Sequence, residues 1–243
     1  MREASGWPDL HQRADGPEWM DVRDYDLAEF EIILRDLEAA NRLTFAAAPT
    51  LGFLEQLTKD WPPGSELRVA DLGYGEGAML RRVHGWATAQ GFRPRLTGVD
   101  MNPRCRALAE RHTAAAMGIE WHEGDLFGWQ PAVRPHAIIS SLFTHHLSSP
   151  DVVRLLRWQE ETASHGWFVN DLHRHWFAWA GFRAMAAAFR WHPCVRHDGA
   201  LSVRRGFRRA EWEGMLAEAG VSGAEIGWHP LFRLCVGRWK APA

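Results

Sequence analysis

The sequence predicts an α/β fold with a doubly wound, mostly parallel sheet of seven strands that ends in an antiparallel pair. Strand-length apolar segments alternate with amphipathic helical segments through the middle of the chain, which is the order of a parallel sheet with crossover helices. A glycine-rich turn follows the first of these strands. The last two apolar segments are separated only by His229-Pro230, which favours antiparallel pairing.

The strands are expected where short apolar segments are bounded by turn residues, and the helices where apolar residues recur every three or four positions. In chain order the strands are expected at residues 67–72, 95–99, 119–123, 136–141, 166–170, 224–228 and 231–237. The helices that connect them are expected at residues 77–90, 103–117, 151–162 and 209–219. Ligands of such sheets bind at the carboxyl ends of the strands, so functional residues are expected there.

Residues 1–64 are expected to form an N-terminal arm and a helical cap, ahead of a main domain at residues 65–243. The first 20 residues or so mix Gly, Pro and charge, which predicts a loose arm. Helical spacing of apolar residues begins at Asp21, and a second cap helix is expected at residues 49–59. Pro62-Pro63-Gly64 then breaks the chain before the first strand.

An insertion at residues 171–205 interrupts the alternation of strands and helices. It is rich in Trp, His, Phe and Arg, and residues 177–189 form an apolar, helix-like core. Its place after the fifth strand predicts a lid over the ligand site. Most of the chain's 14 tryptophans are expected in the core or this lid, where some could line a pocket for a flat ligand.

The composition argues against a nucleic-acid-binding protein and against a membrane-spanning protein. A formal charge of −2 gives no general attraction to nucleic acid, and no apolar run approaches the roughly 18 residues of a membrane span. The cysteines, Cys105, Cys194 and Cys235, lack metal-ligand spacing, so we expect no disulfide, no metal site and a reduced, cytoplasmic protein. A small-molecule ligand is the expected partner, and a homodimer is left open.

The segment Asp71-Leu72-Gly73-Tyr74-Gly75-Glu76-Gly77 joins the first strand to its helix. Gly73 and Gly75 allow backbone angles and a close ligand approach that a Cβ would block, and Gly77 lets the helix begin against the strand. An acid at the strand's end can bind an ammonium group. The turn therefore predicts a cradle for S-adenosylmethionine, although Gly73-x-Gly75-x-x-Ala78 also fits the weaker dinucleotide pattern.

Two more acids follow strands at matching positions. Asp100, followed by Met101, can bind both ribose hydroxyls, and Asp125, followed by Leu126, can accept the adenine amino group. Ser141, at the end of the fourth strand, completes the expected cofactor site. Each acid alone could cap a helix, but the three together are far more specific than the glycines.

These motifs resemble those of the class I S-adenosylmethionine-dependent methyltransferases over residues 66–237. Within that family the chain looks like the small-molecule enzymes of polyketide or quinone tailoring in secondary metabolism. The segments that carry this closer likeness are Asn41-Arg42-Leu43, Thr144-His145-His146-Leu147, Asn170-Asp171-Leu172-His173-Arg174 and Arg196-His197-Asp198-Gly199. The resemblance implies a Rossmann-like methyltransferase fold and an enzyme that methylates a small acceptor.

A hydroxyl acceptor must lose its proton, and histidine is the natural base near neutral pH. His145 and His146 follow the fourth strand, His173 follows the fifth, and His197 lies in the expected lid. We expect His146 and His173 to be the leading bases. Asp171 could orient a histidine, with Arg174 as its ion-pair partner.

Several functions remain open on sequence alone. Methylation of a phenolic or enolic oxygen is the main hypothesis, and carbon methylation of a similar acceptor is its closest rival. A protein that binds S-adenosylmethionine without transferring methyl belongs to a different class. A nicotinamide oxidoreductase is disfavoured because no Tyr-x-x-x-Lys pair is evident. A nucleic-acid base methyltransferase is disfavoured because Ser140-Ser141-Leu142-Phe143 stands where Asn/Asp-Pro-Pro-aromatic is common.

Overall fold

The computed structural model describes residues 7–240, which contain one seven-stranded sheet with the strand order β3-β2-β1-β4-β5-β7-β6. The strands are β1 (Glu66–Leu72), β2 (Arg93–Asp100), β3 (Glu120–Glu123), β4 (Ala137–Ser141), β5 (Gly166–Leu172), β6 (Glu225–His229) and β7 (Arg233–Trp239). β1 to β5 are parallel, and β7 pairs antiparallel with both β5 and β6. The predicted doubly wound sheet with a terminal antiparallel pair is confirmed.

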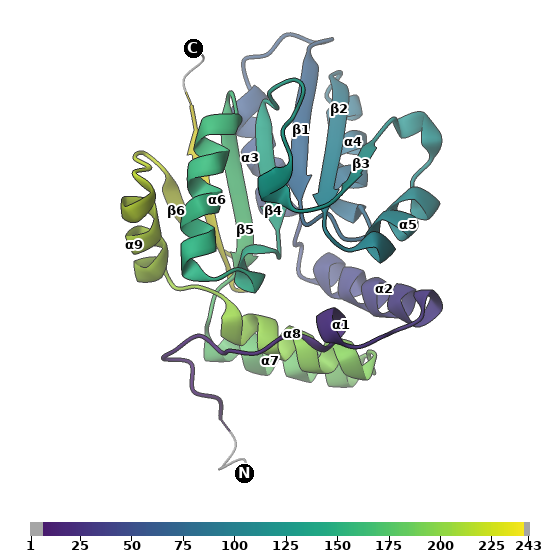
Figure 1. Ribbon diagram of the computed structural model, residues 1–243, viewed down its shortest axis with the longest axis vertical. Coiled ribbons are helices and arrows are strands. Elements are labelled where there is room, and N and C mark those ends of the chain that lie inside the picture. Colours follow the sequence, from purple (N-terminus) through teal and green to yellow (C-terminus); the bar gives the residue numbers. More distant parts are fainter. Residues whose placement is uncertain (1–6, 241–243) are drawn as a thin grey trace.

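Helices cover both faces of this sheet (Figure 1), which is why β1 is apolar on both sides. On one face, Val69 packs in a core with α3 (Ala48–Thr58), α4 (Ala78–Ala89) and α5 (Pro103–His112). On the other face, Ala70 packs in a second core with α6 (Ser149–Thr162) and α9 (Arg209–Ala219). Successive strand residues point to opposite faces, so these neighbours belong to different cores.

A group of helices lies across the carboxyl ends of the parallel strands, at the lower end of the sheet in Figure 1. These are α1 (Trp19–Val22), α2 (Leu27–Leu43), α7 (Trp176–Ala188) and α8 (Pro193–Arg205). The expected insertion therefore folds as two helices, and they stand beside the N-terminal helices. None of the helices within residues 7–240 has both the length and the apolar character needed to cross a membrane.

The predicted loose arm differs from the structure over its described part. Arg13 donates hydrogen bonds to the carbonyls of His145 and Leu147, and the backbone N–H of Ala14 donates to Arg204. The backbone N–H groups of Trp19 and Met20 donate to the Asp198 carboxylate at 2.8 and 2.9 Å. These long-range hydrogen bonds fix residues 13–20 against α8 and against the segment after β4, whereas residues 1–6 of the arm lie outside the described part.

Two element boundaries also differ from the prediction. The helix expected at residues 103–117 ends at His112, because Thr113 and Ala114 are extended, and only a single 3₁₀ turn, η1 (Ala115–Met117), follows. β6 and β7 are joined by three residues rather than two, since His229 still pairs with Arg233. Leu231 and Phe232 of this turn have positive φ angles, 61° and 64°, which bulky residues rarely adopt.

Candidate active site

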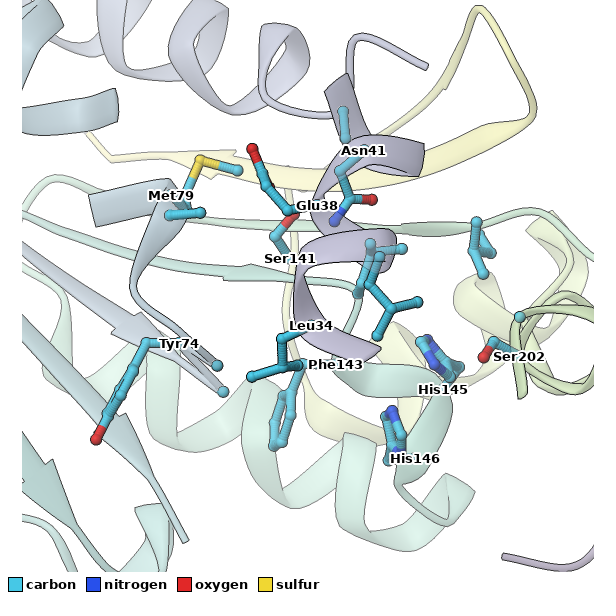
Figure 2. A pocket seen from close by; sticks show the side chains of 18 of the residues that line it. Leu34, Glu38, Asn41, Tyr74, Met79, Ser141, Phe143, His145, His146 and Ser202 are labelled. Carbon is cyan, nitrogen blue, oxygen red and sulfur yellow. The ribbon is translucent and has the colours of Figure 1, made fainter. Parts of the chain in front are cut away.

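A cavity of about 1600 Å³ lies between the carboxyl ends of β1, β2 and β4 and the group formed by α2, α7 and α8. Single-ligand pockets enclose roughly 300 to 1000 Å³, so this cavity has room for a cofactor and an acceptor together. Figure 2 shows its wall: Tyr74 and Met79 come from the glycine turn and α4, Leu34 and Asn41 from α2, and His145 and His146 from the segment after β4.

The glycine turn forms one end of the cavity. Gly73, Gly75 and Gly77 all have positive φ angles, so each needs the freedom of glycine. A Cβ on Gly73 would lie 2.5 Å from Cδ2 of Phe143, whereas one on Gly75 would meet nothing within 4 Å. Gly73 thus allows Phe143 to pack on the turn, and Gly75 leaves open space where a ligand can approach the backbone.

Asp71 is almost fully buried at the end of β1, and its Oδ1 has no hydrogen-bond partner. Burial raises the pKa of Asp71 well above its usual value, and the negative charge of Asp100 raises it further. Buried polar atoms are nearly always paired. An unpaired carboxylate oxygen beside a glycine cradle therefore fits a ligand that brings an ammonium group, as S-adenosylmethionine does.

Asp100 lies beside the turn and is held by two backbone donors. Its carboxylate accepts the N–H of Gly75 at 3.0 Å and that of Asn102 at 2.9 Å. Burial raises the pKa of Asp100, and these two hydrogen bonds oppose the rise. Asp125 accepts the N–H of Phe127 at 3.1 Å and caps the 3₁₀ turn η2 (Leu126–Gly128).

The expected cofactor residues largely converge on the cavity. Its wall includes Asp71, Gly73, Tyr74, Gly75, Asp100, Met101, Asp125, Leu126 and Ser141. Gly77 stands outside the wall and begins α4, where a Cβ would collide with Trp121. Which acid binds the ammonium, the ribose and the adenine stays a prediction.

His145 is buried in the 3₁₀ turn η3 (Thr144–His146), and its ring faces Asp171 of β5. The ring Nδ1 is 2.7 Å from Oδ1 of Asp171, and the backbone N–H of His145 donates to Oδ2 at 2.9 Å. Burial raises the pKa of Asp171, but the charge of His145 and hydrogen bonds from His145, Thr144 and the Leu172 N–H outweigh it and hold this pKa below its usual value. Asp171 is therefore ionised and can accept a hydrogen bond from Nδ1–H of His145, which leaves Nε2 as the ring nitrogen that can exchange a proton with a ligand.

Glu18 of the N-terminal segment stands on the other side of both histidines. Its carboxylate is 3.6 Å from Nε2 of His145 and 3.8 Å from Nε2 of His146. It also accepts a hydrogen bond from Ser202 at 2.8 Å, and burial raises its pKa. Among residues 7–240 these three side chains form the one group with a geometry that could hold a metal ion, with ligand atoms within 4.8 Å of one another.

His173, which is predicted together with His146 as a leading base, lies outside the wall of the large cavity. β5 continues to Leu172, so the chain carries His173 past the cavity, where it bridges to Phe207. It lines a separate cavity of about 360 Å³ that does not reach the cofactor residues. Arg174 pairs with Glu211 at 2.9 Å and not with Asp171 as expected.

His197 also lies outside the wall of the large cavity. Its ring stacks on Trp19 at 3.9 Å, and Nδ1 is 2.7 Å from Asp198. A helix turns by about 100° per residue, so His197 points away from Gly199, Ser202 and Val203, which are among the α8 residues that line the cavity. His145 and His146 are the candidate bases that remain.

Glu18 was missed by the sequence analysis. It belongs to a segment without a motif, and 127 residues separate it from His145 in the chain. The sequence suggests that Asp171 could orient a histidine, but it does not indicate which histidine. A buried acid has no local sequence signal, because burial depends on segments that meet only in the folded chain.

Comparison with known proteins finds a methyltransferase domain in the middle of the chain. Residues 69–166, from β1 to the start of β5, match the family described as "Methyltransferase domain". These residues therefore form a methyltransferase domain, and the sheet order around them is that of the class I S-adenosylmethionine-dependent methyltransferase fold. No curated protein matches this chain in sequence.

Solved structures share the fold of this chain at low identity. The plantazolicin methyltransferase BpumL, in complex with SAH, is 15% identical with a TM-score of 0.65, over 90% of this chain and 91% of that chain. Magnesium protoporphyrin IX methyltransferase (ChlM) from Synechocystis PCC 6803 is 11% identical with a TM-score of 0.56, over 84% of this chain and 87% of that chain. The citrinin polyketide synthase CMeT domain is 12% identical with a TM-score of 0.55, over 78% of this chain and 51% of that chain.

Proposed function

We propose that this methyltransferase transfers a methyl group from S-adenosylmethionine to a phenolic or enolic oxygen of a small aromatic or polyketide-like molecule. The observation that carries the proposal is the buried pair of His145 and Asp171 in the wall of the cavity that also contains Asp71 and Asp100. An oxygen acceptor needs its proton removed, and this pair is arranged as a general base.

The proton has a defined path in this proposal. Nε2 of His145 accepts the acceptor's hydroxyl proton while the oxygen attacks the methyl group, and Asp171 stabilises the imidazolium that results. Glu18, 3.6 Å from Nε2, adds a second carboxylate near the new charge. Asp71 and Asp100 keep their assigned tasks of binding the cofactor's ammonium and ribose.

The acceptor half of the cavity favours a flat apolar molecule. Its wall includes Leu34, Phe177, Phe182, Met185 and Phe232, from α2, α7 and the turn before β7. Aromatic and aliphatic walls of this kind bind ring systems by apolar burial. The insertion at residues 171–205 would then act as the lid over the acceptor, as its sequence suggests.

Three glutamine variants test the base. With S-adenosylmethionine at saturation, we expect His145→Gln to lose about 10²- to 10⁴-fold in turnover while retaining affinity for the demethylated cofactor. His146→Gln should lose less, because no carboxylate lies within 3.2 Å of its ring in the described residues. His122→Gln, whose side chain is exposed outside the cavity, is the matched control.

The product decides between the remaining functions. A new methoxy resonance in the product's NMR spectrum supports oxygen methylation, whereas a methyl on carbon supports the rival reaction, for which the same base could form the enolate. Absence of demethylated cofactor with every hydroxylated aromatic or polyketide acceptor tried would favour the non-catalytic binding protein. Unchanged turnover in His145→Gln would overturn the assigned base.

A further inference from the structure

Arg233, the first residue of β7, is a buried cation in the cavity wall. It is 2% exposed, and within residues 7–240 no carboxylate oxygen lies within 4.0 Å of its guanidinium. Burial lowers the pKa of Arg233, yet an arginine side chain stays charged in proteins. A buried charge without a counter-charge is strongly unfavourable.

The hydrogen bonds of Arg233 are few and long. Its terminal nitrogens donate to Oδ1 of Asn170 at 3.4 Å, and to Oδ1 of Asn41 and Oγ1 of Thr44 at 3.5 Å. Its Nε has no partner. All three acceptors are neutral, and all three distances lie near the limit for a hydrogen bond, well beyond the usual value of about 2.9 Å.

Arg174 shows how the same chain satisfies an equally buried guanidinium. Arg174 is also 2% exposed, but it pairs with the Glu211 carboxylate at 2.9 Å. It also donates to the carbonyls of Gly206 at 2.7 Å and Leu10 at 3.0 Å. The incomplete contacts of Arg233 are therefore particular to its place in the cavity.

The charge of Asp171 acts against the fall in the pKa of Arg233, but none of the hydrogen bonds or ion pairs of Asp171 involves Arg233. Asp171 lies one residue before Leu172, which pairs with Arg233 across the two strands. Its oxygens instead accept hydrogen bonds from Thr144, from the ring and backbone of His145, and from the Leu172 N–H. Asn170 is also fixed, because its amide donates to the Ala46 carbonyl at 2.7 Å.

Arg233 stands on the side of the cavity opposite to the acids that are expected to hold the cofactor. The cofactor acids stand at the ends of β1 and β2, and β4 and β5 lie between β1 and β7. Three strand spacings of roughly 4.8 Å put β7 about 14 Å from β1. Arg233 therefore belongs to the acceptor half of the cavity, together with Asn41 and Thr44.

We propose that Arg233 binds a carboxylate on the methyl acceptor, so that the substrate is a hydroxylated aromatic or polyketide-like acid. The identification of this acid as the methyl acceptor rests on the proposed function, whereas binding of the acid to Arg233 requires no turnover. The planar guanidinium suits a two-oxygen anion, and the amide N–H groups of Asn41 can donate to the same group from the cavity side. The acid would then be fixed by Arg233 while its hydroxyl faces His145.

The test measures binding of two probes that differ only in charge. 2,4-Dihydroxybenzoate and the neutral 2,4-dihydroxybenzamide are titrated into protein saturated with the demethylated cofactor. We expect the wild type to bind the acid about tenfold to a hundredfold more tightly than the amide, and Arg233→Gln to lose that preference. Arg233→Lys, which keeps the charge but not the planar fork, should retain part of it.

The controls separate this proposal from misfolding and from failure of the proposed function. Arg209→Gln removes an exposed arginine on α9 and should keep the preference for the acid. If Arg233→Gln does not fold, the comparison of acid with amide binding in the wild type and in Arg233→Lys still tests the proposal.

Equal binding of acid and amide by the wild type would overturn the proposal, as would an Arg233→Gln variant that keeps the preference for the acid. Weaker binding of the cofactor in that variant, with acid binding intact, would assign Arg233 to the cofactor instead. A protein that binds the acid selectively but transfers no methyl would refute the proposed function alone.

Discussion

His145 and Asp171 are joined twice, through the ring Nδ1 at 2.7 Å and through the backbone N–H at 2.9 Å. The parallel register of β4 and β5, which pairs Ser141 with Asn170, brings the two residues to the same end of the sheet. The backbone hydrogen bond fixes where the histidine stands, and the ring hydrogen bond fixes which nitrogen carries the proton. Both depend on one carboxylate.

Replacing Asp171 with Asn should therefore lower turnover by about 10²- to 10⁴-fold, because the amide can hold the ring in the wrong tautomer. Asp26→Asn is the matched control, since Asp26 caps α2 outside the cavity and Asn caps helices equally well. Single-turnover rates at saturating cofactor, with affinity for the demethylated cofactor as the check on folding, measure the effect. A rate within threefold of wild type would rule out Asp171 as the orienting residue.

Replacing Asp100 with Ala should weaken binding of S-adenosylmethionine by about 1 to 3 kcal/mol, the usual loss for polar groups left without a partner. Calorimetry with the demethylated cofactor measures this, and Asp60→Ala, an exposed site outside the cavity, is the comparison. Nicotinamide dinucleotides should bind to neither protein. Unchanged affinity in Asp100→Ala would remove this residue from the site.

Asp71 should make the ligand-free protein less stable as the pH rises. Burial first, and then the charge of Asp100, raise the pKa of Asp71 well above 3.8. Its contribution to stability is fully present below that value and is lost as the pH rises toward the raised pKa. Asp71→Asn should therefore gain stability relative to wild type as the pH rises above about 4, which a growing difference in Tm between the two proteins would show. A Tm difference that stays constant over this range would contradict the prediction.

Removal of metal ions should leave turnover unchanged. Glu18 already has a hydrogen bond from Ser202 and lies 3.9 Å from the Arg205 guanidinium, so it needs no cation for neutralisation. The measurement is turnover after exhaustive chelation, with the metal content of the protein determined in parallel. Loss of activity that Zn²⁺ or Mn²⁺ restores would instead make Glu18, His145 and His146 a metal site.

Local patterns predicted most of the fold. Each strand and helix of the sheet was located within a few residues, because hydrophobic periodicity and turn residues are properties of short segments. The same holds for the glycine turn and for Asp71 and Asp100, which follow directly from the strands before them. The boundaries that differed, at Thr113 and at the turn after His229, depend on dihedral angles that the periodicity does not specify.

The sequence by itself determined the sheet, the cofactor cradle and the set of histidines from which a base could be drawn. Only the tertiary structure decided that His145 meets Asp171, that Glu18 reaches both histidines from the N-terminal segment, and that Arg233 is buried with neutral hydrogen-bond acceptors alone. The physical reason is that hydrogen bonds and burial at this site join segments far apart in the chain. Strand register and the packing of α8 against the N-terminal segment set those contacts, and no short stretch of sequence encodes them.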